Sequence, residues 1–234
     1  MKEANRSIAK RDQAIRRKRR ISDPTIKPHS HNDDNPDDQL IREFIRNVLK
    51  EQHVDLCGDR ALDLQDALAT AQLAHMGQAR RSGDPYLSHP MEVARIINTY
   101  YPDTPDLCTI ALLHDTLEDA LTQGNVTSQE EMESLIAGSF QDPTVGHQAL
   151  EIVSALTHEK GAPYTDYILQ LVHKPSALKI KLADMLHNIQ SSPSERQLKK
   201  YQDAIVALKD HYDGIPPHID SGHWGALLQA ANIF

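Results

Sequence analysis

The sequence predicts an all-α fold, and three observations support that prediction. Apolar residues recur at helical spacing in one segment after another, and a proline or an N-capping residue precedes many of these segments. No run alternates apolar and polar residues over the length of a half-buried strand. The 234 residues are enough for one well-buried domain together with a tail.

The expected helices follow a polar N-terminal segment. Residues 1–35 mix charge, histidine and proline without a sustained period, so we expect a tail and linker there, then a main domain over 36–215 and a helical extension over 216–234. Pro36 suits the first helical position, and LIREFIRNVL places its apolar side chains on one stripe. Further helices are expected at about 61–79, from Pro90, from Pro105 through ALLHDTLEDA, at 128–139, 144–157, 164–172 and 176–190, from the capping-box pattern Ser192–Glu195 to about 212, and through WGALLQAAN.

Charge separates the N-terminus from the rest of the chain. Residues 1–20 hold nine Lys or Arg and two acids, a net charge of +7, while the whole chain carries −8, so the remainder carries −15. The run Arg16–Arg20 fits an arm that binds nucleic acid or another polyanion, and it also fits a solvated tail, which is the simpler interpretation.

Composition excludes several classes of protein. Cys57 and Cys108 form no CxxC pair, which argues against a zinc ribbon or a disulfide framework. Aromatic residues make up only 5% of the chain, too few for a base-stacking platform. No apolar run approaches a membrane span and no apolar core of a signal peptide follows the basic N-terminus, so we expect a soluble, cytoplasmic protein.

The stretch ALLHDTLEDA places four chemically active side chains in an otherwise apolar segment. If the stretch is one continuous helix, His114 and Asp115 lean toward one point beside it, and Glu118 and Asp119 lie on the same face one turn further along. This pattern suits a metal ion with a carboxylate pair beside it. A solvated acidic helix face explains the same residues, and the His-Asp pair alone does not decide between the two.

Two further segments carry similar chemistry. In IKLADMLHNIQ, Asp184 lies among apolar residues, and a buried carboxylate needs a metal or a cation such as Lys181 beside it. We expect His187 in this segment to point elsewhere and to be structural. In RRSGDPYLSHPMEVA, His89 near a helix start can project into a cleft, and the preceding loop offers groups for phosphate oxygens or a base, namely Arg80, Arg81 and Ser82.

Four co-linear motifs give the sequence a specific resemblance. They are HxGQxR (75–80), RSGDPYLSHP (81–90), ALLHDTLED (111–119) and KLADMLHN (181–188). In order and spacing, over about 65–190, the chain resembles the hydrolase domain of RelA/SpoT homologues, which are HD-superfamily enzymes that cleave the alarmone (p)ppGpp. The resemblance implies the helical bundle of the HD-superfamily phosphohydrolase domain.

The resemblance also implies roles for individual residues. One Mn²⁺ would be bound by His89, His114, Asp115 and Asp184, a donor set that suits a first-row divalent ion. Glu118 and Asp119 match the catalytic acids, Arg80, Arg81, Ser82 and Asn188 match nucleotide contacts, and we expect His75 to brace the loop. Departures from the family pattern leave the base and phosphate preference open: Arg81 stands where many relatives have Lys, Ala120 where Thr is frequent, and 155–168 resembles compact bacterial HD phosphohydrolases.

The expected function is Mn²⁺-dependent hydrolysis of the 3′-diphosphate of ppGpp or pppGpp, giving GDP or GTP and pyrophosphate. Only 46 residues follow Asn188, so the chain is similar to stand-alone small alarmone hydrolases, a class that includes the metazoan SpoT homologues. Two alternatives stay open: a phosphohydrolase of (p)ppApp, NADPH or another nucleotide, and a nucleotide sensor without catalysis.

Overall fold

The fold is helical throughout the part of the chain that the structure describes. A computed structural model describes residues 36–51, 58–80, 83–158 and 161–233, and within these ranges no β-strand forms. One isolated bridge pairs Ala79 with Pro85. The predicted all-α class is therefore confirmed. The predicted tail at 1–35, with its basic arm, lies outside the described residues, as do Arg81 and Ser82.

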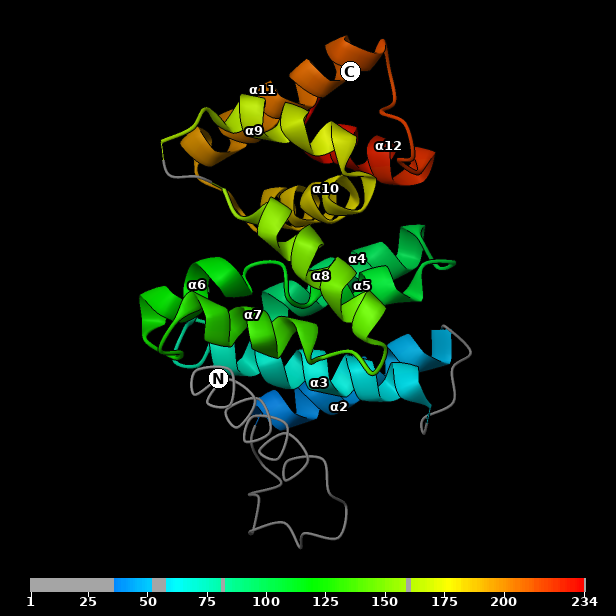
Figure 1. The fold of residues 1–234 in the computed structure, drawn as a ribbon. Coiled ribbons are helices and arrows are strands. Elements are labelled where there is room, and N and C mark those ends of the chain that lie inside the picture. Colours follow the sequence, from blue (N-terminus) through cyan, green and yellow to red (C-terminus); the bar gives the residue numbers. More distant parts are fainter. Residues whose placement is uncertain (1–35, 52–57, 81–82, 159–160, 234) are drawn as a thin grey trace, which may run out of the picture.

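The helices follow the predicted order, and Figure 1 shows their arrangement. They are α2 (Pro36–Glu51), α3 (Asp59–Ala74), α4 (Ser88–Tyr100), α5 (Pro105–Ala111), α6 (Thr116–Gln123), α7 (Gln129–Ala137), α8 (Pro143–Leu156), α9 (Tyr164–Gln170), the 3₁₀ turn η1 (Leu171–His173), α10 (Pro175–Gln190), α11 (Glu195–Tyr212) and α12 (Ser221–Ala230).

Helix α10 is the centre of the packing. It contacts α4, α8 and α12, and Figure 1 shows it between α9, α11 and α12 on one side and α4, α5 and α8 on the other. A helix that packs on several sides has little amphipathic character, because most of its faces meet other helices. The buried residues of α10 are Ala177, Leu178, Ile180, Leu182, Ala183, Asp184, Met185, Leu186 and Ile189, so one acid lies inside an apolar helix.

Local details of α11 and α2 differ from the sequence predictions. Helix α11 is capped by Ser194, whose hydroxyl accepts from Gln197 N, and not by Ser192, which has a positive φ of 56° that lies outside helical geometry. On the predicted stripe of α2, Phe44 and Val48 are buried, but Leu40 is exposed. None of the described helices is long and apolar enough to cross a bilayer.

The C-terminal helix α12 is held against the body through a buried histidine. Asp220 caps α12 by accepting from Gly222 N and His223 N. The imidazole of His223 is fully buried, its Nδ1 lies 2.9 Å from the Tyr101 hydroxyl oxygen, and its ring stacks on Tyr100 with centroids 5.0 Å apart. Burial lowers the pKa of His223 to about 4, although the nearby Asp220 opposes the shift.

We expect this histidine to make stability fall in acid. The unfolded chain takes up a proton near pH 6.5, whereas the folded state does so only near pH 4, so the contribution of His223 is complete above 6.5 and is lost as pH falls. The loss at pH 5 is about 2 kcal/mol of unfolding free energy relative to pH 7.5. Urea unfolding across this range, compared between the wild type and His223→Gln, checks the effect. Parallel pH profiles for the two proteins would contradict it.

Candidate metal centre

The connection between α5 and α6 positions two of the predicted ligands. ALLHDTLEDA, predicted as one continuous helix, is instead interrupted by a turn over 112–115. Backbone bonds here span three residues instead of four, as from Leu113 N to Ile110 O (2.9 Å) and from Thr116 N to Leu113 O (3.1 Å). The hydroxyl of Thr116 also donates to the Leu113 carbonyl at 2.7 Å, which tightens the turn.

Asp115 occupies the N-cap position of α6 but does not cap it. An N-cap carboxylate ordinarily accepts from the first backbone N–H groups of its helix, and that of Asp115 makes no such bond. Its Oδ2 instead accepts from the Tyr86 hydroxyl at 2.9 Å and lies 3.1 Å from His114 Nε2. The turn therefore directs this carboxylate toward the imidazoles and away from its own helix.

A second imidazole reaches the same point from α4. His89 lies in the first turn of α4, and its Nε2 is 3.5 Å from Asp115 Oδ2. Potential ligand atoms of His89, His114 and Asp115 all lie within 4.8 Å of one another. Both imidazoles are buried, whereas Asp115 keeps part of its surface exposed. Residues from α4 and from the α5–α6 turn thus form a three-residue group that could hold a metal ion.

Asp184 of α10 approaches the imidazoles as well. Its Oδ1 lies 3.2 Å from His89 Nε2 and 3.8 Å from His114 Nε2, although Asp184 does not belong to the three-residue group. Its Oδ2 accepts from Lys181 Nζ at 2.9 Å, and Asn188 Nδ2 donates to Oδ1. The lysine pair that we considered as the alternative to metal binding is therefore present, but it uses the other carboxylate oxygen.

The tautomer of His114 supports a cation at this point. His114 Nδ1 lies 2.9 Å from the Ala111 carbonyl, which can only accept, so Nδ1 carries a proton and Nε2 of the neutral ring has a lone pair. That Nε2 is buried, makes no hydrogen bond of good geometry among the described residues, and faces Asp115 Oδ2 at 3.1 Å. Imidazole nitrogens with carboxylate oxygens suit a first-row divalent ion, so the residues present fit such an ion.

The electrostatics of the group favour positive charge between the acids. Burial raises the pKa of Asp115, but His114 and His89 outweigh it and hold that pKa well below its usual range. Burial likewise opposes ionisation of Asp184, yet Lys181 and His89 lower its pKa strongly. Burial lowers the pKa of His89, whereas hydrogen bonds to Asp115 and Asp184 raise it to about 9.

The predicted catalytic acids lie side by side in the first turn of α6 but have different partners. Glu118 is exposed and its Oε1 accepts from the backbone N of His158 at 2.8 Å, in the connection after α8. Asp119 Oδ2 lies 3.4 Å from Nδ1 of His75, at the end of α3. Adjacent helical residues diverge by about 100°, which accounts for the two directions.

The loop that is predicted to contact the nucleotide is described in part. Arg80 Nη2 donates to Asn188 Oδ1 at 3.4 Å, and its guanidinium carbon lies 5.8 Å from the centre of the Tyr86 ring. Arg80 and Asn188, although 108 residues apart in the chain, therefore meet beside Asp184, to which Asn188 also donates a hydrogen bond. His75 stacks near Tyr86 and lies 2.9 Å from Gln78 Oε1 through its Nδ1, contacts that suit a bracing role.

Sequence reasoning missed two residues that contact the three-residue group. Tyr86, which donates to Asp115, lies in a quoted motif, but a tyrosine in a loop has no distinctive spacing. His187 was expected to point away, yet its Nδ1 lies 2.7 Å from His89 Nδ1. The signal was available, because His187 follows Asp184 by three residues and so shares its face of α10. Burial and the nearby cations His89 and Arg80 lower the pKa of His187 to about 4.

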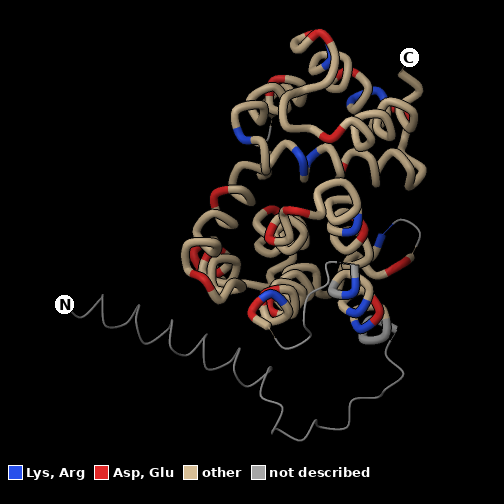
Figure 2. The backbone as a smooth tube through the Cα atoms, turned by 90° about the vertical axis from the view of Figure 1, so that its right-hand side faces the viewer, with Lys and Arg blue, Asp and Glu red and all other residues tan. Residues whose placement is uncertain are grey.

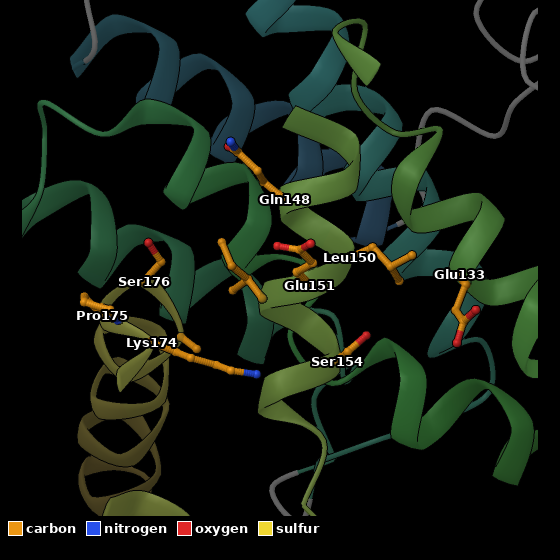
Figure 3. A pocket seen from close by; sticks show the side chains of 10 residues that line it. Glu133, Gln148, Leu150, Glu151, Ser154, Lys174, Pro175 and Ser176 are labelled. Carbon is orange, nitrogen blue, oxygen red and sulfur yellow. The ribbon is translucent and has the colours of Figure 1, made fainter. Parts of the chain in front are cut away.

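One cavity lies away from the three-residue group. Figure 3 shows side chains that line it, around α8 and beside the start of α10. Its volume is about 680 Å³, and its lining includes Glu133, Gln148, Glu151, Lys174 and Ser176. Ser176 precedes Asp184 by eight residues, about 12 Å along a helix. Figure 2 shows acidic and basic residues distributed over many helices of the described chain.

Comparison with known proteins places this arrangement in a family. The family model described as HD domain matches residues 67–207, more than half of the chain. The chain belongs to the HD domain family. The matched span of the HD domain includes every predicted site residue, from Arg80 in the loop to Asn188 on α10.

Individual relatives carry alarmone-related names. The chain is 34% identical over 148 residues to the bifunctional (p)ppGpp synthase/hydrolase RelA of Mycobacterium tuberculosis, covering 62% of this chain and 19% of that protein. It is 32% identical over 140 residues to a GTP pyrophosphokinase of Brucella melitensis, covering 58% and 18%. The resemblance to RelA/SpoT homologues is thus confirmed. The chain spans less than a fifth of the length of these relatives.

We expect Lys181→Met to destabilise the metal-free protein by about 3 kcal/mol, because it leaves Asp184 ionised and buried without its ammonium partner. The measurement is urea unfolding in the presence of a chelator. Lys199→Met is the matched control, since Lys199 and Asp203 form an exposed pair on α11, worth at most about 1 kcal/mol. Equal losses in the two variants would refute the assigned role of Lys181.

Proposed function

We propose that this HD domain hydrolyses the 3′-diphosphate of a guanosine alarmone, ppGpp or pppGpp, to GDP or GTP and pyrophosphate in the presence of Mn²⁺. The observation that carries the proposal is the convergence of His89, His114 and Asp115 from separate elements, with Asp184 beside the two imidazoles. The name of the Mycobacterium tuberculosis relative includes hydrolase activity, whereas that of the Brucella relative is a pyrophosphokinase.

His89, His114, Asp115 and Asp184 are the proposed ligands of the ion. An ion held there supplies Lewis-acid chemistry, lowering the pKa of a water molecule and polarising a phosphoryl oxygen. The protein contributes the orientation of its donors. Tyr86 holds Asp115 by a hydrogen bond, and Lys181 and Asn188 hold Asp184. These contacts restrict each carboxylate to a rotamer that faces the imidazoles.

Glu118 and Asp119 are the proposed acids that move protons. In the hydrolysis, water oxygen bonds to the phosphorus next to the ribose 3′ oxygen, and the bond from that phosphorus to the 3′ oxygen breaks. One carboxyl group takes the water proton and the 3′ oxygen receives a proton as it leaves. Asp119 pairs with His75 and Glu118 is exposed, so their surroundings differ enough for distinct roles.

Arg80 and Asn188 are the proposed contacts of the nucleotide. The guanidinium of Arg80 offers several N–H donors to phosphate oxygens or a flat face to a base. Because Asn188 also donates to Asp184, the two residues join the nucleotide loop to the metal group. Arg81 and Ser82 belong to the same proposed contact, by their position in the motif.

The direct test is release of pyrophosphate. Purified protein with Mn²⁺ should convert ppGpp to GDP and pyrophosphate, and a chelator should stop the reaction. Asp115→Asn, which keeps the shape but removes the charge, should lower kcat/KM by at least about 10²-fold, since it weakens ion binding and also the Lewis-acid chemistry of the bound ion. A panel with (p)ppApp, NADPH and nucleoside phosphates checks the base preference. Binding of nucleotide without turnover under all these conditions would favour the sensor alternative.

A second test separates proton transfer from ion binding. We expect Glu118→Gln and Asp119→Asn each to lower kcat by about 10²–10⁴-fold while leaving the Mn²⁺ affinity within a few-fold of wild type. Titration calorimetry gives the affinity and a pyrophosphate assay gives kcat. Glu130→Gln, at an exposed position in the first turn of α7, is the matched control and should change neither value. Wild-type turnover in both acid variants would remove them from the mechanism.

A further inference from the structure

Three side chains form a hydrogen-bonded series that ends at His89, on the ring nitrogen that does not face the acids. Ser191, just after α10, lies against His187, and His187 lies against His89 of α4. The distance between the two Nδ1 atoms of His89 and His187 is 2.7 Å, and their ring planes are inclined by only 29°. Two nitrogens at this separation share a hydrogen bond, so one ring donates and the other accepts.

The direction of this bond follows from Ser191. Its hydroxyl lies 2.8 Å from the His187 carbonyl, which can only accept, so the single hydroxyl proton is used there. The same oxygen lies 3.3 Å from His187 Nε2 and can only accept from it. His187 therefore carries its proton on Nε2, and its Nδ1 has a lone pair.

The protonation of His187 determines which nitrogen of His89 faces Asp115 and Asp184 with a lone pair. Since His187 Nδ1 accepts, Nδ1 of His89 must donate. With Nδ1 protonated, Nε2 is the only nitrogen of His89 that can offer a lone pair, and it is the one near Asp115 and Asp184. The Ala111 carbonyl fixes His114 in the same way, so both imidazoles present Nε2 to one point.

We propose that His187 is a positioning residue that holds His89 in the tautomer and ring orientation required to ligate a divalent cation through Nε2. The inference rests on the metal site of the proposed function. His187 does not touch the ion or the substrate. It acts through the ring of His89, as acceptors behind ligating histidines do in metal sites generally.

The structure offers a set of matched variants. His187→Leu removes the acceptor, whereas His187→Asn keeps a side-chain carbonyl oxygen at the branch where Nδ1 lies. His173→Leu makes the same change as the first variant at an exposed histidine of η1. Circular dichroism and thermal unfolding verify that each variant is folded before its affinity is compared.

The first measurement is the affinity of the protein for Mn²⁺ alone. The concentration of free Mn²⁺ during the titration is monitored by electron paramagnetic resonance. His187→Leu should bind Mn²⁺ about 10–100-fold more weakly than wild type, because the ring of His89 loses its fixed tautomer and orientation. His187→Asn should restore the affinity to within a few-fold, and His173→Leu should not change it. Equal affinity in wild type and His187→Leu, or failure of the asparagine to restore binding, overturns the inference.

The second measurement needs neither Mn²⁺ nor activity. Nitrogen-15 NMR of the metal-free protein reports which ring nitrogen carries the proton, and His187 should be protonated on Nε2 alone. A proton on Nδ1 of His187 overturns the inference even if the protein is an active hydrolase. If wild type binds no divalent cation, the proposed function and this inference fail together, whereas unchanged binding in His187→Leu rejects the inference only.

Discussion

The structure depends on how two carboxylates are kept ionised beside the apolar core. Asp115 comes from the turn between α5 and α6, and Asp184 comes from the middle of α10. Removing a carboxylate from water costs several kcal/mol even after the protein relaxes, unless positive charge and hydrogen bonds compensate. His89, His114, Lys181 and Tyr86 provide that compensation, and each one is placed by a different local feature of the fold.

Helix α10 connects this constraint to the core. A helix that packs against α4, α8 and α12 cannot rotate without disturbing those contacts, so the direction of Asp184 is set by apolar packing. Helix α4, which carries His89, is among those neighbours. The distance between Asp184 and His89 therefore follows from how two core helices, α10 and α4, pack against each other.

The helical spacing of apolar residues was sufficient to predict the fold class, whereas the grouping of the proposed ligands was implied by the resemblance of their motifs to a family. His89, His114 and Asp184 lie in separate motifs, and each motif combines an apolar helical pattern with a polar residue that has no reason to be buried alone. The turn at 112–115 could not be predicted, because Leu112 and Leu113 continue the apolar spacing and are buried as they would be in a helix. The break is visible only in the backbone hydrogen bonds and in the carboxylate of Asp115, which does not cap α6 although Asp115 occupies the N-cap position.

Residues around the ligands were harder to predict, because their roles depend on contacts between distant segments. Tyr86 lies inside a quoted motif that gives no sign of its contact with Asp115. The spacing of His187 from Asp184 gives its face of α10, but it does not say that His89 of α4 lies against that face. Lys181 was the exception, since an i, i+3 pair with Asp184 is local to one helix. The two interpretations weighed for Asp184, ion pair or metal ligand, proved compatible because a carboxylate has two oxygens.

The network around Asn188 adds a link between the two halves of the site. Its amide donates to Asp184 through Nδ2 and accepts from Arg80 through Oδ1, so a single planar group lies between the predicted nucleotide loop and a proposed ligand of the ion. Rotation of that amide to follow Arg80 would turn Nδ2 away from Asp184 as well, because both atoms belong to one rigid plane. For the proposed nucleotide and ion, linkage requires that any effect of one on the affinity of the other be matched by an equal effect in return. The side-chain amide of Asn188 therefore couples the orientation of Arg80 in the loop to that of Asp184 on α10, although Arg80 and Asn188 are 108 residues apart in the chain.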